Sequence, residues 1–189
     1  MTLILRNERV RVIAALVVMA EILGFSSVSV LPTLARDVVG GDASALGAMT
    51  AARAIGGVCG VLLLAGLGLR GRGGRMMVTT AAVFGLALVA LAASGGLLLA
   101  CAALLIVGAT GSALDTLGQT LVQRSVSEHE RSSAMGIWTF AIGFGPIGIL
   151  CMGAAAVSVG APAALAASGA LMTAGAVTLG SVTPLRDLE

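Results

Sequence analysis

Residues 76–121 read MMVTTAAVFGLALVALAASGGLLLACAALLIVGATGSALDTLGQTL, and this stretch decides the fold. Two apolar runs, residues 76–93 and 97–121, stand on either side of a Ser-Gly-Gly tripeptide. A helix needs about 20 mostly apolar residues to cross the hydrocarbon layer of a membrane. Both runs come close to that length or exceed it, and serine followed by two glycines favours a tight turn. The stretch therefore predicts two membrane-spanning helices joined by a short turn.

Four more apolar runs of similar length complete the pattern, at residues 10–31, 45–69, 134–157 and 161–182. Pro32 is expected to end the first of them, because proline cannot continue a helix. Ser44 is expected to cap the start of the second. The sequence thus predicts an all-α integral membrane protein, in which six transmembrane helices form a single bundle without a linker between domains.

The composition agrees with this interpretation and excludes soluble classes of protein. Of the 189 residues, 58% are hydrophobic and 11% are charged, whereas about 25% of residues are charged in an average soluble domain. So few charges cannot cover a water-exposed surface, which excludes soluble enzymes and disordered tails. The three cysteines lie far apart inside apolar runs, and we interpret them as buried small hydrophobic residues.

All eleven basic residues are arginines, and their distribution predicts the orientation of the helices. With the N-terminus in the cytoplasm, the outside loops carry only Arg36, and the cytoplasmic segments carry Arg6, Arg9, Arg11, Arg70, Arg72, Arg75, Arg124, Arg131 and Arg186. Cytoplasmic loops of membrane proteins carry an excess of basic residues. We therefore expect both termini on the cytoplasmic side of a cell membrane (plasma or inner). Because the arginines do not gather on one face, no nucleic-acid partner is expected.

Three charged residues lie inside the predicted spans, namely Glu21, Arg53 and Asp115. A charge at the centre of a bilayer costs about 3 kcal/mol or more, so such residues usually face the interior of the bundle or a water-filled cavity. One interpretation is a proton or substrate pathway. The other is structural: Arg53 pairs with one of the acids, or each charged side chain reaches the membrane surface from near a helix end, which is not expected of Glu21 because it lies in the middle of its span. Gln119 follows Asp115 by one helical turn, and it is expected either to line the cavity or to bond a neighbouring helix.

Glycine and proline predict where the helices approach one another or bend. Gly56 and Gly60 have the GxxxG spacing that lets two helix backbones come close. Gly145 and Pro146 stand in the middle of the fifth span and are expected to kink it, because proline removes a backbone donor and clashes with the preceding turn. Just before that span, residues 127–130 have the Ser-x-x-Glu pattern of a capping box.

The sequence favours neither an enzyme nor a cofactor-binding protein. Residues 66–71, GLGLRG, match the pattern GxGxxG, but they follow a membrane helix rather than a strand. No acidic residue stands about 20 positions downstream, as a dinucleotide site would require. His129 is the only histidine, so neither a metal cluster nor a Ser-His-Asp triad is expected. We predict no catalytic residues, no cofactor and no metal site.

Several stretches are similar to one half of a Major Facilitator Superfamily transporter. Residues 5–9 and 31–40 resemble the entry to the seventh helix of drug and siderophore exporters and the segment that follows it. Residues 123–136 resemble the loop between the tenth and eleventh helices, and residues 143–148 resemble the glycine-proline kink of the eleventh. The resemblance covers essentially the whole chain and points to the C-terminal half.

This resemblance implies a fold, an activity and roles for several residues. The implied activity is proton-coupled efflux of small amphipathic molecules, with the first and fourth spans lining a central cavity. Glu21 would be the protonatable switch, and Arg53 and Asp115 would tune its charge or contact the substrate. Part of the cytoplasmic loop motif of the family is present as Gly66, Gly73 and Arg75.

The resemblance also implies partners, because a working member of the family has two six-helix halves around a midplane site. Beside the lipid bilayer and a small-molecule substrate, the implied partner is a second six-helix half. It would lie upstream in the same chain, in a second copy, or in a different protein. The alternative interpretation is a non-transporting membrane interaction or assembly protein, or an inactive fragment of a longer transporter.

Overall fold

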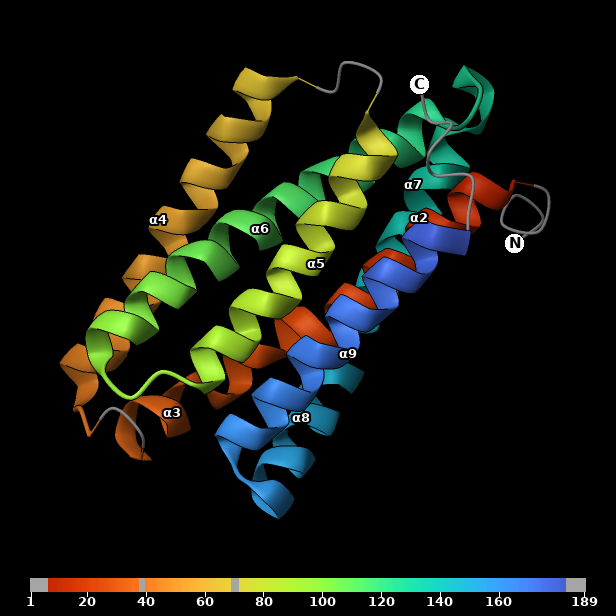
Figure 1. Cartoon of the computed structure of the whole chain (residues 1–189). Helices are drawn as coiled ribbons and strands as arrows, with labels where there is room; N and C mark the ends of the chain where they lie inside the picture. Colours follow the sequence, from red (N-terminus) through yellow and green to blue (C-terminus); the bar gives the residue numbers. More distant parts are fainter. Residues whose placement is uncertain (1–6, 38–39, 69–71, 183–189) are drawn as a thin grey trace.

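The computed structural model describes residues 7–37, 40–68 and 72–182, and within these ranges the chain is helical with no strand. Figure 1 shows the helices running side by side as an elongated bundle. The elements are α2 (Glu8–Met19), the π-helical turn η1 (Ala20–Gly24), the 3-10 helix η2 (Phe25–Val30), α3 (Leu31–Asp37), α4 (Ala43–Leu67), α5 (Gly73–Ala92), α6 (Leu97–Arg124), the 3-10 turn η3 (Glu128–Glu130), α7 (Arg131–Ile142), α8 (Gly145–Val159) and α9 (Ala161–Val182).

Six of the described helical segments are long and apolar enough to cross a membrane. Four of them consist of a single helix each, α4, α5, α6 and α9. The other two are composite: the first combines α2, η1, η2 and α3, and the fifth combines η3, α7 and α8. The prediction of an all-α membrane protein with six transmembrane helices is therefore confirmed.

The first span differs from the prediction at both its end and its middle. Pro32 does not end it, since the helix continues to Asp37. Proline is tolerated there because it occupies the second position of α3, in the first turn, where a missing N–H leaves no hydrogen bond unmade. The unforeseen feature is the change from α-helix to π-helix at Ala20 and to 3-10 helix at Phe25.

The second span begins at a different cap from the one predicted. Asp42, rather than Ser44, caps α4: its Oδ1 accepts hydrogen bonds from the backbone N–H of Ser44 at 2.9 Å and from the Ser44 hydroxyl at 2.6 Å. Ser44 lies inside the first turn and donates to the cap. The hydrogen bonds from the Ser44 side chain and backbone hold the pKa of the Asp42 carboxyl below its usual range.

Glycines on both partners hold α4 against α6, which lie side by side in Figure 1. A Cβ atom added at Gly56 would overlap the carbonyl of Leu105, and one added at Gly60 would overlap the carbonyl of Ala109. In the other direction, a Cβ at Gly108 on α6 would overlap the carbonyl oxygen of Arg53 on α4. The two backbones are therefore in direct contact, as small residues at an interface allow.

The fifth span is divided into two helices next to Gly145 and Pro146, where the sequence predicts a kink. Helix α7 ends at Ile142, α8 begins at Gly145, and Pro146 lies in the first turn of α8. Trp138 on α7 is buried against Gly118. At the start of the span the capping box is present, with the hydroxyl of Ser127 donating to the Glu130 carboxylate at 2.8 Å.

The cysteines are free, but the expectation that they are buried in the protein is wrong. Cys59 and Cys151 are exposed and Cys101 is half-buried. Their neighbours on the outer surface of the bundle are apolar, among them Leu63 and Leu150, which are 64% and 74% exposed. A small apolar side chain is compatible with such a surface because lipid tails, unlike water, solvate it.

Candidate functional site

Glu21 lies in the irregular middle of the first span, inside the π-helical turn η1, and only 9% of it is exposed. Single π-helical turns within α-helices are frequent at functional sites. Serine side chains donate hydrogen bonds to backbone carbonyls of this irregular segment. The hydroxyl of Ser26 donates to the carbonyl of Ile22 at 2.7 Å, and the hydroxyl of Ser168 on α9 donates to the carbonyl of Leu23 at 2.5 Å. These bonds stabilise a non-α conformation at membrane depth.

The break between α7 and α8 makes room for the Glu21 side chain. A Cβ atom added at Gly145 would lie 3.1 Å from Oε2 of Glu21, so the carboxylate faces the first residue of α8. One turn later, a Cβ at Gly148 would lie 2.7 Å from the Cα of Ile22, which places the two backbones in close contact. A helix N-terminus carries a partial positive charge, so the start of α8 is a favourable neighbour for an acid.

Asp115 approaches the same position from α6. It is half-buried, and its carboxylate is close enough to that of Glu21 for the two to interact electrostatically. The Glu21 carboxylate accepts no hydrogen bond from a side chain among the described residues. Every side-chain nitrogen or oxygen that is fully buried in these residues has a hydrogen-bond partner. The carboxylate oxygens of Glu21 therefore remain open to the space beside them. The structure brings together the two acids that the sequence placed on different spans.

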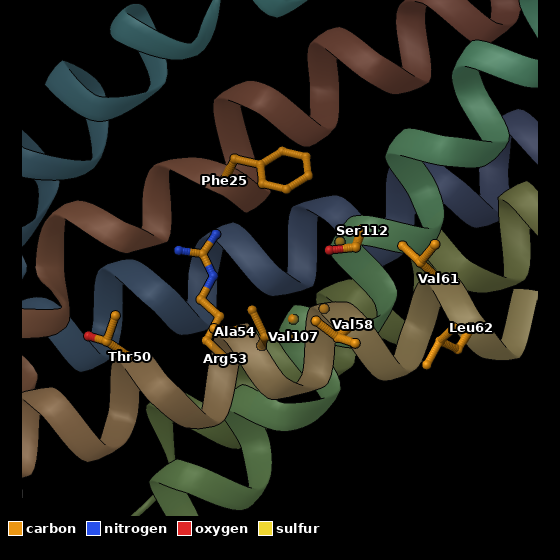
Figure 2. A pocket seen from close by; sticks show the side chains of 12 residues that line it. Phe25, Thr50, Arg53, Ala54, Val58, Val61, Leu62, Val107 and Ser112 are labelled. Atoms are coloured by element: carbon orange, nitrogen blue, oxygen red, sulfur yellow. The ribbon is translucent and has the colours of Figure 1, made fainter.

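Arg53 does not pair with either acid, so the structural ion pair considered from the sequence is not formed. Within the described residues the ion pairs are Arg11–Glu8, Arg36–Asp37 and Arg131–Glu128, at N–O distances of 3.5, 2.7 and 3.6 Å, all near the ends of spans. Instead, the half-buried Arg53 side chain lines a cavity of about 690 Å³ between α4, α6 and η2. Figure 2 shows its guanidinium pointing away from α4 toward the helix that carries Phe25.

The walls of this cavity include residues that sequence reasoning did not single out. They are Phe25, Thr50, Val58 and Ser112, together with Gly108 and Gly111. Phe25 packs against Phe84 with ring centroids 5.4 Å apart, and a Cβ at Gly111 would lie 3.2 Å from the Phe25 ring. The serines that follow Phe25 in the sequence were the available signal that this part of the span is irregular.

The remaining candidates do not line the cavity. Gln119 is exposed and forms no side-chain hydrogen bond within the described residues, so the expected bond to a neighbouring helix is absent there. Gly66 lies near the end of α4, Gly73 is buried at the start of α5, and Arg75 is exposed two residues later. Arg6, Arg70 and Arg186, which contributed to the predicted orientation, lie outside the described residues.

Metal binding finds no support among the residues that the structure places, because nowhere do three or more His, Cys, Asp or Glu side chains gather in a way that could hold an ion. The pair formed by Glu21 and Asp115 lacks the third ligand that such a site would need.

Comparison with known proteins gives one finding. The sequence model of the Major Facilitator Superfamily matches residues 13–187, which is nearly the whole chain. No curated protein sequence and no solved structure matches it significantly. The matched range includes Glu21, Arg53 and Asp115, together with all the residues named above that line the cavity.

Proposed function

Since this chain belongs to the Major Facilitator Superfamily, we propose that it is part of a proton-coupled exporter of small amphipathic molecules. In this proposal Glu21 is the protonatable switch, and Asp115 sets the charge around it. Arg53 and Gln119 lie on the substrate path.

The observation that carries the proposal is the meeting of Glu21 and Asp115 inside the bundle without an arginine. Intramembrane charges that only stabilise a fold are expected to be paired, because an unpaired charge is costly in an apolar environment. These two carboxylates are near enough to interact electrostatically, and Arg53 forms no ion pair with either. An arrangement of this kind favours binding and release of protons over structural pairing.

The irregular helix around Glu21 supports a link between protonation and movement. A protonated carboxyl is tolerated in an apolar span far better than an ionised one. Glu21 lies in a π-helical turn, which packs against α8 at Gly145 and Gly148. A change of charge at Glu21 would therefore alter the contact between the first and fifth spans. We propose that this contact shifts when a proton is exchanged for substrate.

A complete transport site requires the second six-helix half that this family uses. We propose that this half covers the surfaces of α4 and α8 that face away from the bundle. Large apolar side chains are exposed there, including Leu63 at 64% and Leu150 at 74%. With both termini in the cytoplasm, as the arginine distribution favours, α2 and α6 would run in opposite directions through the membrane.

The experiment that tests the proposal measures release of charged probes from proteoliposomes. Purified chain is reconstituted, and the vesicles are loaded with 2-naphthalenesulfonate or with (2-naphthylmethyl)trimethylammonium, both permanently charged. Acidifying the outside should accelerate release of at least one probe, accompanied by proton entry that a pH-sensitive dye trapped inside reports. Protein-free liposomes are the control. If the gradient accelerates the release of neither probe, proton-coupled export by this chain alone or by a pair of its copies is contradicted.

A further inference from the structure

The cavity beside Arg53 contains one kind of charge. Its lining includes the guanidinium of Arg53 and no carboxylate. Phe25 follows Glu21 by four residues, and Gly111 precedes Asp115 by four, so the acids lie about one helical turn away from the lining residues of their own helices. A ligand in the cavity would therefore contact a cation directly and the two acids only at a distance.

Hydrogen-bond donors are available next to that cation. An arginine guanidinium presents five N–H donors in a planar fork, which fits carboxylate, sulfonate and phosphate groups. The hydroxyl of Ser112 forms no hydrogen bond with the described residues, so it can donate to a ligand. By contrast, the hydroxyl of Thr50 already donates to the carbonyl of Leu46 at 2.8 Å. The polar part of the cavity thus consists of the Arg53 fork and one hydroxyl.

The other walls are apolar and suit a hydrocarbon or aromatic body. Phe25 covers one side, and Val58, Val61 and Val107 line others. The volume of about 690 Å³ falls within the range of roughly 300–1,000 Å³ that is usual for small-molecule sites. Gly108 and Gly111 leave space where larger side chains would reduce the volume.

We propose that this cavity binds an amphipathic anion, whose negative headgroup is held by Arg53 and Ser112 while its apolar body lies against Phe25 and the valines. The inference deepens the proposed function because it assigns the substrate class: small organic anions rather than cations. The role of this binding site in transport rests on that proposed function. Arg53 is then the residue that determines specificity by charge. Binding of the anion would also compensate the intramembrane charge of Arg53, which has no acidic partner within the described residues.

Equilibrium dialysis of the purified chain in an uncharged detergent tests this assignment. The probes are 2-naphthalenesulfonate and (2-naphthylmethyl)trimethylammonium, which share one ring system and differ in charge. The unmodified chain is expected to bind the sulfonate more tightly. Arg53→Gln should weaken sulfonate binding about 10- to 100-fold, the usual effect of losing a hydrogen bond to a charged group. Binding of the ammonium probe should not weaken.

Two further variants and a control keep the test independent of folding defects. Arg53→Lys retains the charge without the fork and should keep the preference for the sulfonate with a smaller loss of affinity. Ser112→Ala should weaken the sulfonate only, by about 2- to 10-fold. Arg124→Gln, at the exposed end of α6, is the matched control and should change neither dissociation constant.

Equal binding of the two probes by the unmodified chain would overturn the inference, and so would an unchanged sulfonate affinity in Arg53→Gln. Because dialysis needs no proton gradient, its outcome is separate from that of the transport assay. If release proves uncoupled from protons while Arg53 still selects the anion, the proposed function fails and the binding site stands. If coupling is present but Arg53 has no effect on binding, the anion assignment alone fails.

Discussion

Replacing Glu21 by glutamine is expected to abolish the acceleration of probe release by a pH gradient. Glutamine has nearly the same shape but cannot exchange a proton, so the step that couples proton entry to export is lost. Exchange of probe between the two sides without a gradient should persist, because the cavity beside Arg53 does not include Glu21. The measurement is release from proteoliposomes with and without a pH difference across the membrane.

The matched control for this variant is Glu8→Gln. Glu8 belongs to the same span but is exposed at its start, where it pairs with Arg11 at 3.5 Å. Coupling should remain intact in that variant. A second comparison is Asp115→Asn, in which Glu21 keeps its proton chemistry but loses a neighbouring charge, so that coupling should persist and shift in its pH dependence. Full gradient-driven release by Glu21→Gln would show that Glu21 is not the switch.

Gly108→Ala is expected to destabilise the bundle, although alanine is the better helix former. The added methyl group would overlap the carbonyl oxygen of Arg53, which belongs to the backbone of α4 and cannot rotate away. Forcing extra atoms into a packed interface costs about 1–3 kcal/mol. Thermal unfolding of the purified chain in detergent should therefore show a lower Tm. Because the same contact places Arg53 beside the cavity, affinity for the sulfonate probe should fall as well.

Gly47→Ala is the control for that substitution. Gly47 lies in α4, like the carbonyl that Gly108 contacts, but nothing stands within 4 Å of where its Cβ would be. This variant should gain up to about 1 kcal/mol from the higher helix propensity of alanine. A Tm for Gly108→Ala equal to or above that of Gly47→Ala would mean that the close approach of α4 and α6 does not hold the bundle together.

The class of fold could be predicted from the sequence because the bilayer imposes it locally. A run of about 20 apolar residues must satisfy its backbone hydrogen bonds internally, and a helix achieves this within one segment. The six apolar runs therefore specified an all-α membrane protein without knowledge of how the helices pack. Even the division of the fifth span was signalled, since Gly145 and Pro146 stand where α8 begins.

The geometry of the site could be predicted only in part. The sequence identified Glu21, Arg53 and Asp115 because charges inside apolar runs are conspicuous. Which of them meet depends on the rotation of each helix about its axis. That rotation is set by contacts between segments distant in sequence, such as Gly108 against Arg53. No short sequence pattern encodes this rotation. The sequence therefore could not decide whether Arg53 forms an ion pair with one of the acids.

Local exceptions to the usual patterns could not be predicted from the sequence, for a related reason. No characteristic amino-acid composition marks a π-helical turn such as the one at Glu21. This turn is stabilised in part by Ser168, which is 145 positions away from its partner Leu23. Trp138 is a second such exception, since tryptophan is often found at the membrane surface. In the structure it is buried because Gly118 on α6 leaves space for its ring.

The most direct test of a transport pathway is whether water reaches the face of α6 that carries Asp115 and Gln119. Gln119, exposed one turn after Asp115, is replaced by cysteine in a chain whose three native cysteines are changed to alanine. The chain in membrane vesicles is then treated with a charged thiol reagent. Ser127→Cys, in the exposed turn before η3, serves as the labelled reference, and Leu150→Cys, on the exposed apolar surface of α8, as the unlabelled one. A transport pathway predicts labelling of Gln119→Cys at a rate approaching that of Ser127→Cys. Reactivity as low as that of Leu150→Cys would contradict the pathway and favour a non-transporting membrane protein.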